Sequence, residues 1–139
     1  MCNRTINNGK RARQLILFDG MNIEKRSFTD FDAVMEWRNL AWLVFEVKHG
    51  NKGVPVGQRI ALERFVMDAR KAGKRALAAV VEHYEDDASK GIYLKDCETR
   101  SLFVSSELRW RPPKRPMTAK ELMHEYIKHV EATQTGRFY

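Results

Sequence analysis

Four side chains that could cleave a phosphodiester bond lie around an apolar segment in the first half of the chain. Glu46 and Lys48 follow the apolar run 41–45, and two aspartates, Asp30 and Asp32, lie in the preceding segment. The run is rich in β-branched and aromatic residues, which predicts a strand with Glu46 and Lys48 on one face. Carboxylates beside an ammonium group are suited to metal-dependent phosphodiester cleavage.

The segment before this run predicts a second strand that pairs with it. Residues 30–37 alternate polar and apolar side chains, and only residues 38–40 separate them from the run. A connection of that length suits a three-residue hairpin loop, in which Trp37 pairs with Ala41.

This hairpin would bring like charges together. Its register puts Asp32 opposite Glu46 and Asp30 opposite Lys48, with facing Cβ atoms roughly 5 Å apart. Carboxylates directly opposite each other destabilise a sheet, so we expect a divalent cation to neutralise them. Hard oxygen ligands of this kind favour magnesium or manganese.

A strand, a helix and a further strand follow in order. After a glycine-rich loop, residues 58–72 have the apolar spacing of a helix, and Gly73 suits its C-terminal end. The continuous apolar run 75–82 predicts a buried parallel strand. Gln58, at the start of the helix, is either a solvent-exposed residue or a side chain directed at Lys48.

The order of these motifs resembles the PD-(D/E)xK nuclease superfamily. The chain is similar to archaeal-type Holliday junction resolvases, to virus-type replication-repair nuclease domains and to small phage-encoded proteins, over about residues 28–84. No proline precedes either aspartate, so the choice between Asp30 and Asp32 as main metal ligand stays open. The thirteen-residue spacing to Glu46 favours Asp32. Some members also use an acidic residue of an N-terminal helix, for which Glu24 is the nearest candidate.

The resemblance implies a fold and a set of roles. The fold would be α/β, a single restriction-endonuclease-like domain with a mixed central sheet flanked by helices. Asp32, Glu46 and the backbone carbonyl of Val47 would hold Mg²⁺, with Mn²⁺ as a substitute and Asp30 as an alternative or additional ligand. Lys48 would position or deprotonate the attacking water and stabilise charge on the phosphate, and Gln58 would orient water or phosphate.

The composition is consistent with DNA as the partner. The chain has 139 residues, a net charge of +7 and a pI near 9.6, which favours binding to polyanions. The residues expected to contact DNA are Lys10, Arg11 and Arg13 in an N-terminal arm, Lys52 in the glycine-rich loop, and Arg109, Trp110, Arg111, Lys114 and Arg115 in a proline-rich segment. The arginines and the tryptophan of that segment would form a phosphate track with one stacking platform; a solvated linker is an equally good interpretation.

The whole chain is expected to form one domain. We divide it into a basic arm (1–13), a core (14–106), a basic proline-rich loop (107–117) and a C-terminal helix (118–133) that opens with a capping box. Within the core, residues 14–18 predict a short strand, and residues 92–94 and 101–104 a hairpin.

The remaining features suggest a cytoplasmic protein. Cys2 and Cys97 are far apart and have no zinc-binding spacing, which favours free thiols, and no segment reaches transmembrane length. The sequence thus predicts a magnesium-dependent DNA endonuclease that is structure-selective and acts on branched or junction DNA as a homodimer, in phage or bacterial recombination, repair or processing. The alternative is a non-catalytic DNA-binding or host-modulating phage protein with the same fold.

Overall fold

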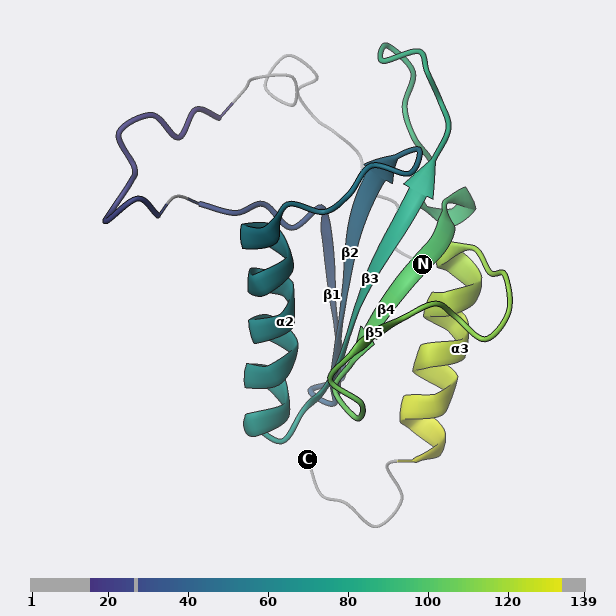
Figure 1. Ribbon diagram of the computed structural model, residues 1–139. Helices are drawn as coiled ribbons and strands as arrows, with labels where there is room; N and C mark the ends of the chain where they lie inside the picture. Colours follow the sequence, from purple (N-terminus) through teal and green to yellow (C-terminus); the bar gives the residue numbers. More distant parts are fainter. Residues whose placement is uncertain (1–15, 27, 134–139) are drawn as a thin grey trace, which may run out of the picture.

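The computed structural model describes residues 16–26 and 28–133. These residues form an α/β domain in which one open sheet lies between two helices (Figure 1). The elements in chain order are β1 (Ala33–Trp37), β2 (Ala41–His49), α2 (Val56–Lys71), β3 (Arg75–His83), the 3₁₀ helix η1 (Leu94–Asp96), β4 (Glu98–Val104), β5 (Trp110–Arg111) and α3 (Ala119–Ala132). The predicted fold class is confirmed.

The sheet is mixed, and its spatial order, β1-β2-β3-β4-β5, is the order of the strands in the chain. β2 and β3 are parallel, and the other three ladders are antiparallel. The predicted hairpin is confirmed, because Trp37 pairs with Ala41 across a three-residue loop. Arg38 and Asn39 have positive φ in that loop, a conformation that asparagine tolerates well.

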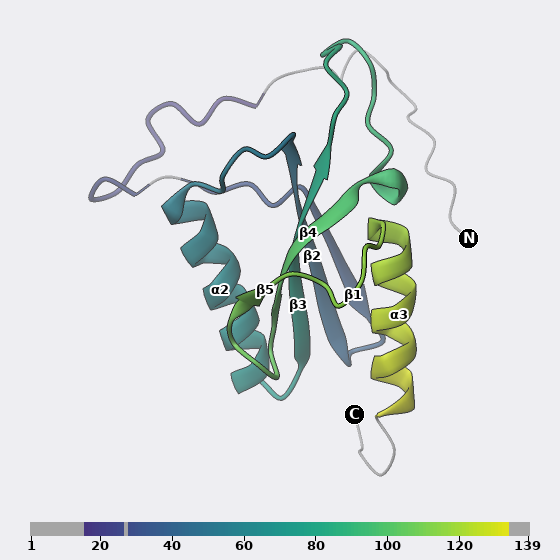
Figure 2. The same cartoon turned by 45° about the vertical axis from the view of Figure 1, so that its right-hand side comes forward.

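Each helix covers one face of the sheet, as the two views show (Figures 1 and 2). On the α2 face, Leu62 and Val66 pack against Val44 of β2 and against Ala76 and Ala78 of β3. On the opposite face, Leu122 and Val130 of α3 pack against alternate residues of the same strands. The central strands are therefore buried on both faces, which explains their almost continuous apolar sequence.

The helix between the parallel strands ends as its sequence predicts. Gly73 has φ +81°, its N–H donates to the carbonyl of Arg70, and the N–H of Lys74 donates to the carbonyl of Ala69. These two bonds form a Schellman motif, which requires a left-handed residue at the position of Gly73.

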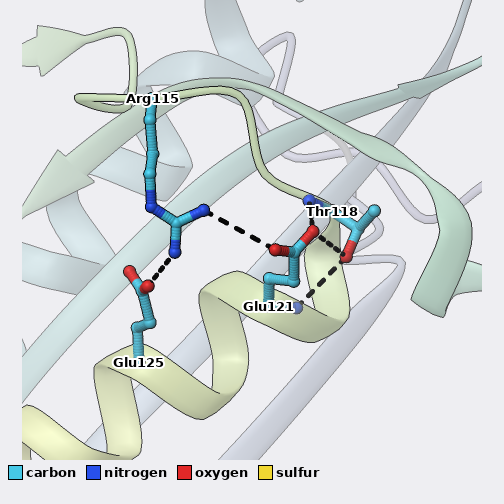
Figure 3. Close-up of polar contacts among 4 residues, drawn as sticks. All are labelled: Arg115, Thr118, Glu121 and Glu125. Carbon is cyan, nitrogen blue, oxygen red and sulfur yellow. Dashed lines mark hydrogen bonds and ion pairs between the residues drawn. The ribbon is translucent and has the colours of Figure 1, made fainter.

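The capping box of the C-terminal helix is also confirmed. The hydroxyl of Thr118 accepts from the backbone N–H of Glu121, whose carboxylate accepts from the backbone N–H of Thr118 (Figure 3). Arg115, in the segment just before the helix, pairs with Glu121 and Glu125 on its first two turns (Figure 3). The capping box satisfies two backbone donors at the start of the helix, the N–H groups of Thr118 and Glu121.

Several predicted elements were wrong. Residues 16–18 are not a strand, and residues 14–15 of that prediction lie outside the described part. Residues 92–94 form no hairpin with 101–104; the chain turns into η1, and β4 pairs with β3 and β5 instead. The segment 107–117 is not all loop, because it contains β5.

The first predicted strand begins three residues later than expected, at Ala33. The Asp32 side chain gives the physical reason: its Oδ2 accepts the Val47 N–H at 2.7 Å, so a carboxylate takes the place of a ladder partner. In the part of the chain that the structure describes, no helix combines the length and the apolar character that a membrane span requires.

Candidate active site

The predicted cluster lies at one end of the sheet, where β2 ends and α2 begins (Figure 1). Glu46 and Lys48 are on the face of β2 that α2 covers, because they alternate in step with Val44 of the α2-side core. Gln58 is in the first turn of α2. Glu46 is only 2% exposed, and it is the one charged side chain that is buried among residues 16–26 and 28–133.

Lys48 is held between a carboxylate and an amide. Its Nζ lies 3.3 Å from Glu46 Oε1 and donates to Gln58 Oε1 at 3.1 Å. The amide nitrogen of Gln58 donates in turn to the backbone carbonyl of Asp30 at 3.3 Å. Of the two interpretations of Gln58, the structure therefore favours the one in which its side chain reaches Lys48.

Asp32 is the aspartate whose carboxylate meets Glu46. Its Oδ2 accepts from the Val47 N–H, and its negative charge acts on the Glu46 carboxylate. Asp30 contributes a backbone carbonyl to the cluster, through Gln58. The predicted juxtaposition of Asp32 and Glu46 is present, and the Asp30–Lys48 pairing is replaced by a contact through Gln58.

The electrostatic state of Glu46 reflects this crowding. Burial is the largest cause that raises the pKa of the Glu46 carboxyl, and the neighbouring Asp32 charge raises it further. Lys48 lowers the pKa, but it offsets these effects only in part. Glu46 Oε2 is buried and has no hydrogen-bond partner in the part of the chain that the structure describes, which is costly for a carboxylate oxygen.

The donor set fits a hard divalent cation. Asp32 and Glu46 supply carboxylate oxygens, and the free Glu46 Oε2 is the kind of atom that such a cation would satisfy. In a β-strand, the N–H and the C=O of one residue point to the same side of the strand. Because the Val47 N–H points to Asp32, the Val47 carbonyl is also on that side, beyond the last β1–β2 pair, Ala33–Phe45. No set of three His, Cys, Asp or Glu side chains in residues 16–26 and 28–133 is arranged to hold a metal. A cation here would therefore keep several waters, as magnesium does.

Glu24, the nearest candidate for a further acidic residue, lies in a segment without helical structure. It lies in a tight turn closed by the Ile23–Arg26 bridge and has φ +52°, so it is not in a helix.

Arg100 is a site-supporting residue that the sequence did not reveal. From β4 it donates to Glu82 Oε2 at 2.9 Å and to the carbonyls of Lys52 and Gly50 at 2.6 and 2.7 Å. It thus fixes the loop between Lys48 and Gln58. Its partners are 18 to 50 residues away, and no local spacing signals such a contact.

The predicted DNA-binding segment has acidic partners. Arg109 and Arg111 both pair with Glu107, and Arg115 pairs with Glu121 and Glu125. The Trp110 indole donates to Glu63 Oε2 at 2.7 Å, and its ring packs on Phe103 at a centroid distance of 5.3 Å. Trp110 therefore has a packing role that explains its presence without a nucleic acid base.

The other predicted DNA contacts are less constrained. Lys52 and Lys114 are exposed, whereas Lys10, Arg11 and Arg13 lie outside the described residues.

Comparison with known proteins gave no match: neither a family model, nor a curated protein, nor a solved structure resembles the chain significantly.

Proposed function

We propose that this protein is a metal-dependent DNA endonuclease of restriction-endonuclease-like type. The observation that carries the proposal is the meeting of Asp32 and Glu46, with an unpartnered buried oxygen on Glu46, beside a lysine held in place by Gln58. A buried carboxylate beside a second carboxylate is costly without a cation, whereas a cation with a lysine beside it is what phosphodiester hydrolysis uses.

Each residue of the cluster has a role in this proposal. Asp32, Glu46 and the Val47 carbonyl would hold Mg²⁺ or Mn²⁺, which supplies a Lewis acid for the phosphate and an acidified water. Lys48 would stabilise negative charge on the phosphate in the transition state and help to deprotonate the water. Gln58 orients the Lys48 ammonium group through a direct hydrogen bond.

DNA is the proposed substrate, with branched or junction forms preferred. The net charge of +7 supports a polyanionic partner, and exposed Arg109, Lys52 and Lys114 are available for phosphate contacts. Cleavage of two strands at symmetric positions would use a homodimer, with one cluster for each strand. Phage or bacterial recombination or repair in the cytoplasm is the setting that the sequence resemblance suggests.

Cleavage of labelled four-way junction, flap and duplex DNA, with and without magnesium, tests the proposal. We expect magnesium-dependent cleavage that Glu46→Gln and Asp32→Asn each abolish, while DNA binding is kept or becomes tighter because a negative charge is removed. Asp68→Asn, an exposed aspartate on the outside of α2, is the matched control and should cleave normally. Full activity in Glu46→Gln would refute the assignment.

The second candidate function is a non-catalytic DNA-binding protein. The observation that favours it is the Glu46–Lys48 ion pair, because a buried carboxylate already has a cationic partner without any metal. A protein of this kind would cleave none of the DNA forms, and Lys48→Ala would weaken DNA binding as a lost phosphate contact does.

A further inference from the structure

A second candidate site lies at the opposite end of the sheet from the carboxylates. A groove of about 500 Å³ opens where α2 ends, β3 begins and the last turns of α3 pass. Its volume is within the range of pockets that hold small ligands. The residues of its lining that matter here are Arg70, Lys74, Arg75, Ser106, Tyr126 and His129.

Three cations of this groove are held only by neutral oxygen atoms. Arg70 donates to the Ser105 carbonyl at 3.0 Å, and Lys74 donates to the Asn39 carbonyl at 2.6 Å and to its side-chain oxygen. Arg75 donates to the hydroxyl and the carbonyl of Thr133. These bonds fix the orientation of the cations without cancelling their charge.

Other arginines of the described chain have carboxylate partners. Arg100, Arg111 and Arg115 each pair with a carboxylate, and even the exposed Arg109 has one. Among residues 16–26 and 28–133, no carboxylate pairs with Arg70, Lys74 or Arg75. The end of α2 favours positive charge, but that effect applies equally to Lys71, which lies outside the groove lining.

A buried hydroxyl provides an independent sign of a ligand. Tyr126 lines the groove and is 8% exposed, and its buried hydroxyl has no hydrogen-bond partner among the described residues. Tyrosine hydroxyls in such positions usually find a partner. The Arg75 charge acts on this hydroxyl, so the orphan group lies at the cationic part of the groove.

The groove continues into a hollow with apolar walls. This second hollow, of about 600 Å³, shares Val104, Ser106, Tyr126 and His129 with the first. Leu102 and Met117 belong to its apolar wall, and charged side chains that include Glu107, Arg115 and Glu125 line the rest. A ligand that lies across both would contact cations at one end and apolar side chains at the other.

We propose that this groove binds a small organic phosphate of about the size of a nucleoside monophosphate. The phosphate would accept hydrogen bonds from Arg70, Lys74 and Arg75, which are oriented in advance and carry uncompensated charge. The organic part would satisfy the Tyr126 hydroxyl and extend along the apolar wall. The site is separate from the Asp32–Glu46 cluster and does not depend on the proposed nuclease activity.

Calorimetric titration of the full chain with three probes tests the proposal. Adenosine 5′-monophosphate and ribose 5-phosphate should bind saturably and more tightly than inorganic phosphate. Lys74→Ala should weaken binding of all three about tenfold or more, as loss of a charged hydrogen bond does. Lys71→Ala, at the last residue of α2 and three residues before Lys74, is the matched control and should change the affinity less than about twofold, like a loosely held surface charge.

Tyr126→Phe examines the organic end of the site. Because the hydroxyl has no partner in the free protein, its removal should leave folding intact, yet it should weaken adenosine monophosphate binding about three- to tenfold and leave inorganic phosphate unchanged. Arg70→Ala replaces Lys74→Ala if loss of the Asn39 contact unfolds the chain.

Three results would overturn the proposal. The first is an absence of saturable binding of either organic phosphate. The second is an equal loss of affinity in Lys71→Ala and Lys74→Ala, which would mean diffuse attraction to a basic surface. The third is an affinity for inorganic phosphate as high as for the organic phosphates, which would leave the apolar wall and Tyr126 without a role.

Discussion

Magnesium should stabilise the fold through Asp32 and Glu46, even before any DNA is added. The two carboxylates lie close together, and one Glu46 oxygen is buried without a partner, so a cation that binds them removes both sources of instability. The diagnostic variant is Asp32→Asn. Its amide oxygen can still accept the Val47 N–H, but the negative charge is gone.

The size of the effect follows from mass action. Above the dissociation constant, each tenfold increase in magnesium adds about 1.4 kcal/mol to the free energy of unfolding. A chain of 139 residues has an unfolding entropy of about 0.3 kcal/mol/K near 60 °C, so the melting temperature should rise by about 5 °C for each tenfold increase. The assay is thermal unfolding followed by circular dichroism over a magnesium series, with sodium chloride adjusted to keep the ionic strength constant.

The control variant and the site variant should differ in how their melting temperatures respond to magnesium. Asp68→Asn should show the same magnesium dependence as the natural sequence, and Asp32→Asn should show almost none while it melts at a higher temperature in the absence of metal. If the melting temperature of Asp32→Asn still rises by about 5 °C for each tenfold increase in magnesium, the ion binds elsewhere and the assignment of the site is wrong.

Two further predictions concern the same cluster, and a third concerns the basic segment 107–117. Burial and Asp32 raise the pKa of Glu46 in the native state. The metal-free protein should therefore gain stability as the pH falls from neutrality through that raised pKa, and lose stability as the pH rises. Urea unfolding over a pH series should show this dependence, and Glu46→Gln should remove it. Lys48→Ala should lower the single-turnover cleavage rate at saturating protein with little change in DNA affinity, because it stabilises charge that appears only during reaction. The double change Arg109→Ala and Lys114→Ala should instead weaken binding and reduce its salt dependence by about one phosphate contact for each lost cation, in a filter-binding series over salt concentration.

The parts of the fold that the sequence predicted are those set by nearby residues. The β1–β2 hairpin follows from a short loop between two periodic segments, and the end of α2 follows from Gly73. The capping box at Thr118 needs only four consecutive residues. The carboxylate pair could be predicted for the same reason, since the hairpin register alone brings Asp32 to Glu46.

The parts that could not be predicted depend on residues distant in the chain. Ile92 and Tyr93 have the apolar character of a strand, yet β3 and β5 occupy the two edges of β4, so the residues before η1 remain exposed. The basic segment likewise looks free in the sequence, because the pairing of Arg115 with Glu125 exists only after α3 has docked. Spacing along the chain contains no information about such partners.

The order of the sheet also bears on how the chain reaches its native state. Because β1 to β5 are neighbours in space in the same order as in sequence, every ladder joins consecutive strands. Loop closure between neighbours costs little entropy, so we expect the sheet to grow one strand at a time from the β1–β2 hairpin. The Asp32–Glu46 pair belongs to that first hairpin, so electrostatic repulsion at the candidate active site would act from the earliest step of folding, and a metal ion would assist folding as well as stability.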